Sequence, residues 1–190
     1  MSIPLSHIKE AIIAYTEKFP RSDLQSLQPL LEAINTSDDI TARTHLPGHV
    51  TTSAVILNEE NKVLHIKHKI LNTWLLPGGH CENADSTLVS ASLREVYEET
   101  GIPSDCLKRI LPENVPIDID LHPIPANPRK GEPEHWHADF RFAYRLVSIA
   151  KVALQEEEVT DYAWLPLEQM PMRGLANRLY DFIKTSTTAT

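Results

Sequence analysis

Apolar and polar positions alternate with the period of an α-helix in the first part of the chain. One run repeats every three or four positions, at Ile8, Ala11, Ile12, Tyr15 and Phe19. A second run repeats in the same way, at Leu24, Leu27, Leu31 and Ile34. The segment 20–23, which begins with a proline, separates them, so residues 1–45 are predicted to form a helical hairpin. We expect this hairpin to pack on the rest of the chain or on a second subunit of a homodimer, or to cover a substrate.

From residue 46 the pattern changes to short apolar or alternating runs, which are typical of strands. Strands are predicted at 50–57, 63–68, 117–124, 136–147 and 159–165. An amphipathic helix is predicted at about 173–184, before a short polar tail at 186–190. Strands on both sides of a central helix, with another helix at the end, predict an α/β domain over 46–185 with a mixed sheet between helices.

Composition narrows the classes of function. The 190 residues carry a formal net charge of −8, which argues against binding nucleic acid or a membrane surface through bulk electrostatics. No apolar run approaches the length of a membrane span. The two cysteines predict no disulfide framework, and the first residues lack the pattern of a secretory signal. We therefore expect a cytoplasmic protein whose partner is a small molecule.

Three glutamates stand out in the central helical segment. Glu95, Glu98 and Glu99 follow the spacing i, i+3 and i+4, so they share one face of a helix. Like charges at this spacing repel each other, whereas a hard divalent cation bound by carboxylate oxygens would reverse that repulsion. A solvated acidic face is the alternative interpretation. The glutamates therefore predict either a metal site or an acidic surface.

The residues around the glutamates favour the metal site. Gly78 and Gly79 follow a short apolar run and permit a close approach of main-chain carbonyls to a ligand. Asp85 and Ser86 are candidate N-cap residues for the helix, and Gly101 is expected to end it. Two glycines, a cap and a C-terminal glycine thus define a short loop followed by the acidic helix.

This segment resembles the signature of the Nudix hydrolase family. The signature is Gly, five residues, Glu, seven residues, Arg-Glu, an aliphatic residue, any residue, Glu-Glu, any residue, Gly and an aliphatic residue. Gly79 and residues 94–102 match it. Asp85 takes the place of the first Glu, and eight residues instead of seven separate it from Arg94. We expect one extra residue at the junction of loop and helix, which puts Asp85 in question as the supporting acid.

The resemblance implies an α/β/α sandwich and hydrolysis of a diphosphate linkage in a nucleoside diphosphate-type substrate. It further implies that Glu95, Glu98 and Glu99, with the carbonyl of Gly79, bind Mg²⁺ or Mn²⁺. Arg94 would orient a glutamate, and Arg94, Glu95 and Glu98 are the expected catalytic residues. Two alternatives are a Nudix-fold isomerase of a prenyl diphosphate and a Nudix-like module that binds a nucleotide without catalysis.

A second polar pattern lies on a predicted strand. His135, His137, Asp139 and Arg141 alternate with apolar residues, so they share one face of that strand. We expect a wall of the active cleft, with Arg141 on a phosphate, Asp139 as its orienter or a further metal ligand, and the histidines on phosphate or base. An exposed polar face is the alternative. A structural zinc site is disfavoured because no cysteine accompanies the histidines at the required spacing.

Two further charged segments could contribute to the site. Arg129 and Lys130 lie in a polar loop and could reach an anionic ligand, although a solvent-exposed loop is the simpler interpretation. The run 156–158 consists of three glutamates and is typical of a solvated surface. Several Nudix enzymes use an acid outside the motif, so one of these glutamates is a candidate metal ligand or base.

Overall fold

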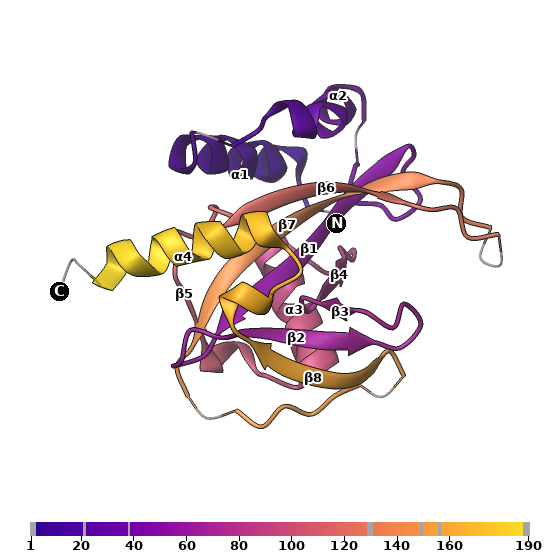
Figure 1. Ribbon diagram of the computed structural model, residues 1–190. Coiled ribbons are helices and arrows are strands. Elements are labelled where there is room, and N and C mark those ends of the chain that lie inside the picture. Colours follow the sequence, from indigo (N-terminus) through magenta and orange to yellow (C-terminus); the bar gives the residue numbers. More distant parts are fainter. Residues whose placement is uncertain are drawn as a thin grey trace.

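The computed structural model describes residues 3–20, 22–37, 39–128, 131–148, 150–155 and 157–187 (Figure 1). Arg129, Lys130 and Glu156, three of the charged candidates, lie outside the described residues. The helices are α1 Leu5–Lys18, α2 Gln28–Thr36, α3 Leu88–Thr100 and α4 Arg173–Thr187, with short 3₁₀ helices at Gln25–Leu27, Ser104–Cys106 and Leu167–Gln169. Among the described residues, none of these helices is both long and apolar enough to span a membrane.

Within these residues, eight strands form one mixed sheet. The strands are β1 Gly48–Leu57, β2 Val63–His68, β3 Trp74–Leu75, β4 Gly78–His80, β5 Leu107–Arg109, β6 Asp118–Ile124, β7 His135–Leu146 and β8 Val159–Leu165. The two longest strands, β1 and β7, run parallel over their whole paired length. The other edge of β1 pairs with β4 near its start and with β2 at its end. β4 is therefore held beside the first half of β1.

The sheet lies between helices, and this confirms the predicted α/β/α sandwich. Alternate residues of β1 point to opposite faces. Ala54 and Ile56 pack in one apolar cluster with Val96 of α3. Val55 and Leu57 pack in a second cluster with Leu179 of α4. Figure 1 shows α4 crossing in front of the sheet and α3 behind it.

The N-terminal helices form the predicted hairpin and pack on the sheet domain. Ile8 and Leu30 are fully buried in the same cluster as Phe140 of β7. At the other end of the contact, the backbone N–H of Leu88 donates to Nε2 of His7 over 3.3 Å. Figure 1 shows α1 and α2 beside β6. The hairpin therefore contributes to the core of this subunit, and its role as a lid or a dimer contact stays a prediction, as do the domain boundaries.

The predicted elements differ from the observed ones mainly at their ends. The second helix begins at Gln28, four residues after the predicted start, because Pro29 lies in its first turn, where a missing N–H costs nothing. The strands at 63–68 and 159–165 have the predicted bounds. β3, β4 and β5 were not predicted, because two or three residues are too few for an apolar period to appear.

Candidate active site

The acidic helix α3 is capped by residues other than those expected. Thr87 is the N-cap: its side chain accepts a hydrogen bond from the backbone N–H of Ser90, and the Ser90 hydroxyl accepts one from the N–H of Thr87, both over 3.0 Å. The expectation of Asp85 and Ser86 as caps was therefore wrong. Gly101 ends the helix as predicted, with a left-handed φ of 66°.

Asp85 does not cap α3 because its carboxylate binds elsewhere. The side chain is only 5% exposed, and its Oδ2 accepts a hydrogen bond from the backbone N–H of Glu82 over 2.8 Å. Both carboxylate oxygens accept hydrogen bonds from the guanidinium of Arg94, Oδ1 from Nε over 3.2 Å and Oδ2 from Nη2 over 3.0 Å. The extra residue is thus accommodated before Thr87, and Asp85 still reaches the arginine of the motif.

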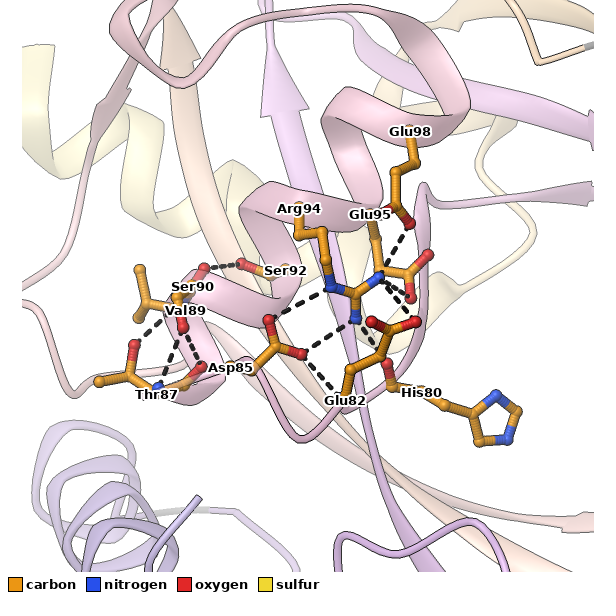
Figure 2. A network of polar contacts seen from close by, with 10 residues as sticks. All are labelled: His80, Glu82, Asp85, Thr87, Val89, Ser90, Ser92, Arg94, Glu95 and Glu98. Atoms are coloured by element: carbon orange, nitrogen blue, oxygen red, sulfur yellow. Dashed lines mark hydrogen bonds and ion pairs between the residues drawn. The ribbon is translucent and has the colours of Figure 1, made fainter. Parts of the chain in front are cut away.

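Arg94 connects the loop to the glutamates, as Figure 2 shows. Its Nη2 also donates to the carbonyl oxygen of His80 over 2.8 Å. Its Nη1 donates to Oε1 of Glu95 over 3.0 Å and to Oε2 of Glu98 over 2.9 Å. One planar guanidinium therefore fixes two glutamates relative to the loop, a task that a lysine ammonium could not perform with the same geometry.

The three glutamates differ in exposure. Glu98 is 45% exposed at its side chain, Glu95 is 14% exposed, and Glu99 is buried. Oε2 of Glu99 accepts a hydrogen bond from the backbone N–H of Gly78 over 2.8 Å. The carboxylate of Glu95 lies against Gly79, since a Cβ at that position would be 2.6 Å from Oε1 of Glu95. The absence of a side chain at Gly79 thus lets β4 approach α3 closely, whereas Gly78 lies against Thr52 and Ser53 of β1.

The buried carboxylates are difficult to ionise in the metal-free protein. Burial raises the pKa of Glu95 to about 7, against the opposing attraction of Arg94. Burial likewise raises the pKa of Glu99 to about 8, against the hydrogen bond from Gly78, and repulsion by Glu95 adds to the increase. A set of oxygen donors whose negative charges lack sufficient compensation suits a hard divalent cation. The residues present therefore fit the metal site that the motif predicts.

One glutamate outside α3 lies within electrostatic reach of this group. Repulsion by Glu158 contributes to the raised pKa of both Glu95 and Glu99. The preceding segment is held against the end of α3, where Gln155 donates its N–H to the carbonyl of Glu99 over 3.3 Å. Folding therefore brings Glu158 near the acidic helix, although nearly sixty residues separate Glu158 from Glu99 in the sequence.

The polar row of β7 lies on the face of the sheet opposite the acidic helix, and its role as a wall of the active cleft stays a prediction. Ala143 continues the row and packs in the cluster with α4, whereas Phe140 and Phe142 pack in the cluster with α3. The row therefore faces away from the acidic helix. The guanidinium of Arg141 donates to Asp118 over 3.0 Å, to Asp120 over 2.7 Å and to Asp139 over 2.9 Å. With only 7% of the residue exposed, Arg141 is held within a group of carboxylates.

The histidines of the row line a cavity of about 430 Å³. His135 and His137 share it with two histidines that sequence reasoning did not single out, His49 of β1 and His80 of β4. Burial, followed by the neighbouring imidazoles, lowers the pKa of His137 to about 2. The missed signal is the register: His49 pairs with His137 across β1 and β7, which only the strand order reveals.

Comparisons with known proteins agree with this fold. The sequence profile of the NUDIX domain matches residues 47–185. A protein named probable DHNTP pyrophosphohydrolase, from Lactococcus lactis subsp. cremoris, is 30% identical over 172 residues, which cover 88% of this chain and 90% of that protein. The RNA pyrophosphohydrolase of Rhizobium meliloti is 31% identical over 104 residues, which cover 52% of this chain and 61% of that protein.

Solved structures give the same picture. An Ap4A hydrolase of C. elegans, in a binary complex, superposes with a TM-score of 0.55 at 18% identity, over 72% of this chain and 98% of that one. The E. coli dihydroneopterin triphosphate pyrophosphohydrolase superposes with a TM-score of 0.52 at 19% identity, over 72% of this chain and 95% of that one. At these identities the similarity shows the fold alone. The profile begins at residue 47, so it does not include α1 and α2.

Proposed function

Because this chain belongs to the Nudix hydrolase family, we propose that its acidic helix carries out metal-dependent hydrolysis of a diphosphate linkage in a small triphosphate or diphosphate substrate. The observation that supports this most directly is the group of three glutamates, two of them bound by Arg94, beside the glycines of β4. Such a group would be unfavourable without a cation, since two of its carboxylates have raised pKa values.

The donors proposed for Mg²⁺ or Mn²⁺ are the carboxylates of Glu95, Glu98 and Glu99 and the carbonyl oxygen of Gly79. When bound there, the ion would neutralise phosphate oxygens and lower the pKa of a bound water. Arg94 is proposed to act through its ion pairs, which hold Glu95 and Glu98 in place, and its own position depends on Asp85 and the carbonyl of His80.

The proposed reaction is an attack of water on phosphorus. A P–O bond forms to the water oxygen, the bond to the bridging oxygen breaks, and the leaving phosphate keeps that oxygen. The water proton must pass to a base. We assign this role to Glu158, because its carboxylate is exposed and lies within electrostatic reach of Glu95 and Glu99, yet is absent from the hydrogen bonds of Arg94.

Dihydroneopterin triphosphate is the first substrate to test, because the Lactococcus relative that carries DHNTP in its name aligns over nearly the whole length of both chains. His135 and His137 are proposed to contact the base or a phosphate, since both line the cavity. A direct contact of Arg141 or Asp139 with the substrate stays a prediction. It would require the ion pairs of Arg141 to rearrange.

The test is a panel of dihydroneopterin triphosphate, nucleoside triphosphates, ADP-ribose and dinucleoside polyphosphates, assayed with Mg²⁺ or Mn²⁺ for released phosphate and pyrophosphate. We expect turnover of at least one compound, which a chelator stops. Release without any divalent cation would contradict the assignment of the glutamates. Tight binding without release would favour the non-catalytic module, and rearrangement of a prenyl diphosphate without phosphate release would favour the isomerase.

A further inference from the structure

Three strands bring three imidazoles together on the sheet face opposite α3. They belong to His49 of β1, His80 of β4 and His137 of β7, and one nitrogen of each lies within 4.8 Å of the others. The strand register explains this convergence. His49 pairs directly with His137, and His80 pairs with Thr51, two residues further along β1 and on the same face as His49.

At least one ring nitrogen of this group is buried and takes part in no hydrogen bond among the described residues. Nδ1 of His49 lies 3.4 Å from the carbonyl oxygen of His45, whereas its buried Nε2 has no hydrogen-bond partner among the described residues. His135, at the edge of the group, has Nδ1 at 2.8 Å from the carbonyl of Pro133 and Nε2 at 3.2 Å from Nε2 of His137. Histidine ligands of metals commonly use one nitrogen for a carbonyl and the other for the ion.

We propose that His49, His80 and His137 form a second metal site, which takes a borderline divalent ion such as Zn²⁺ and is separate from the glutamate site. Imidazole nitrogen suits Zn²⁺ and its transition-metal neighbours, whereas the carboxylate and carbonyl oxygens of the glutamate site suit Mg²⁺ or Mn²⁺. The two sites therefore select different ions by ligand chemistry.

The spacing requires only a modest contraction. Zn–N bonds of about 2.0–2.1 Å in a tetrahedral site place the nitrogens about 3.4 Å apart. The three imidazoles lie within 4.8 Å of one another, so each ring has to move by roughly an ångström, which small side-chain rotations supply. No cysteine is needed, because three histidines with an open fourth position are one of the known zinc arrangements.

The fourth position of the proposed site faces the cavity. The cavity of about 430 Å³ is lined by all three ligands and by Arg43, Glu132 and His135. A water or an anionic oxygen of a ligand can therefore complete the coordination. This distinguishes the site from a closed structural zinc site, whose four ligands all come from the protein. The guanidinium of Arg43 is bound to Glu132 over 2.8 Å at the cavity wall.

The experiment is calorimetric titration of the metal-stripped full chain with Zn²⁺. It is carried out first with Zn²⁺ alone and then in excess Mg²⁺, which is expected to occupy the glutamate site. We expect one Zn²⁺ per chain. His80→Gln and His137→Gln are each expected to weaken this binding by at least the roughly 10-fold to 100-fold that the loss of an outer-shell partner typically costs. The matched control is His68→Gln, since the imidazole of this β2 histidine, among the described residues, accepts hydrogen bonds only from the backbone N–H groups of Ile70 and Leu71.

Two results would overturn the proposal. One is the absence of saturable Zn²⁺ binding to the wild-type chain, and the other is binding that persists in both histidine variants but is lost in Glu98→Gln. A second measurement needs no variant and so does not depend on folding of the mutants. Zn²⁺ should shift the imidazole nitrogen resonances of three histidines in the wild-type NMR spectrum, and unshifted resonances would equally contradict the site. Co²⁺ should give the strong visible bands of a nitrogen-rich site of low coordination number, as opposed to the weak bands of an octahedral oxygen site.

Discussion

The carboxylate of Asp85 forms two hydrogen bonds with the guanidinium of Arg94, at 3.2 and 3.0 Å. This pair holds the arginine that in turn contacts Glu95 and Glu98. Asp85 is buried and Arg94 is 19% exposed at its side chain, so neither group is freely solvated. The pair therefore links the loop in which this chain departs from the family signature to the geometry of the proposed metal site.

Replacing Asp85 should disturb the site through Arg94. Asp85→Ala leaves the guanidinium without two acceptors, and we expect the free energy of unfolding to fall by about 1–3 kcal/mol and turnover to fall by about 10-fold to 100-fold. Urea denaturation and steady-state kinetics measure the two effects. Asp85→Asn keeps one acceptor oxygen for Arg94 and should retain more of both properties. Equal activity of Asp85→Ala and wild type would show that the pair does not position the glutamates.

Glu98→Gln should leave the fold largely intact while it reduces metal-dependent turnover to background, since an amide oxygen replaces the most exposed of the proposed carboxylate ligands. Circular dichroism checks the fold, and phosphate release checks the activity. The matched control is Glu17→Gln on α1, whose exposed side chain lies on a different helix. Full activity of Glu98→Gln would falsify its assignment as an essential ligand.

Gly79→Ala tests the close approach of β4 to α3. The added Cβ would lie 2.6 Å from Oε1 of Glu95, at the far end of a flexible side chain, so the carboxylate should move and the fold should survive. We expect turnover to fall by about tenfold or more, with a small change in melting temperature. Gly174→Ala on α4 is the control, because a Cβ there meets no atom within 4 Å. If both variants behave alike, the proximity of Gly79 and Glu95 has no functional importance.

The assignment of Glu158 as base predicts a loss of kcat without a loss of stability. Glu158→Gln should lower kcat by about 10²-fold to 10⁴-fold, because this is the usual contribution of a general base. Its exposed side chain predicts an unchanged melting temperature. Glu157→Gln, one residue away and also exposed, is the control and should retain activity. Comparable losses in the two variants would argue for a nonspecific charge effect and against a base at 158.

The stability of the metal-free protein should fall as the pH rises from the ordinary glutamate pKa of 4.5 to about pH 8. Glu95 and Glu99 have folded pKa values of about 7 and about 8, above their ordinary values, so the folded state retains protons that the unfolded state has lost. Stability therefore decreases with rising pH until both groups ionise in the fold. Histidines with lowered pKa values, such as His137 and His80, act in the opposite direction and destabilise the fold only on the acidic side of about pH 6.5.

Thermal melts in a chelator between about pH 7 and about pH 8.5 measure this effect. We expect Mg²⁺ to raise the melting temperature more at the upper end of that range, where the uncompensated carboxylates are ionised. Glu99→Gln should flatten the dependence on pH, because it removes the group with the larger shift. A wild-type melting temperature that is constant or rises across this range would contradict the raised pKa values.

The sequence predicted the elements whose pattern is local. Helical spacing placed Glu95, Glu98 and Glu99 together, and alternation placed His137 and Arg141 on one face of a strand. The face on which each helix packs was not predictable, because it depends on which strands pair. For the same reason the sequence did not predict that Asp118 and Asp120 form ion pairs with Arg141.

The convergence of the histidines is a further case. His49, His80 and His137 come from separate parts of the chain, and only the parallel pairing of β1 with β7 and the short pairing of β4 bring them together. Asp85 is the opposite case, because its contact with Arg94 forms although its spacing in the sequence put that contact in question. Its shorter side chain and the extra residue after it both depart from the family spacing, yet the loop still delivers its carboxylate to Arg94. The family signature specifies positions in the sequence, whereas the contact between Asp85 and Arg94 depends on the conformation of the loop.

The strand β4 contributes to both proposed sites within three residues. The backbone N–H of Gly78 donates to Glu99, and the carbonyl oxygen of His80 accepts from Arg94. The imidazole of His80 points away from Arg94 (Figure 2) toward the other histidines. Two ions bound at these places would therefore share one backbone segment. Any change that Zn²⁺ causes in the affinity for Mg²⁺ must then be matched by an equal change that Mg²⁺ causes in the affinity for Zn²⁺, because a coupling free energy is reciprocal. The occupancy of each site would then depend on the concentration of the other ion to the extent of that coupling.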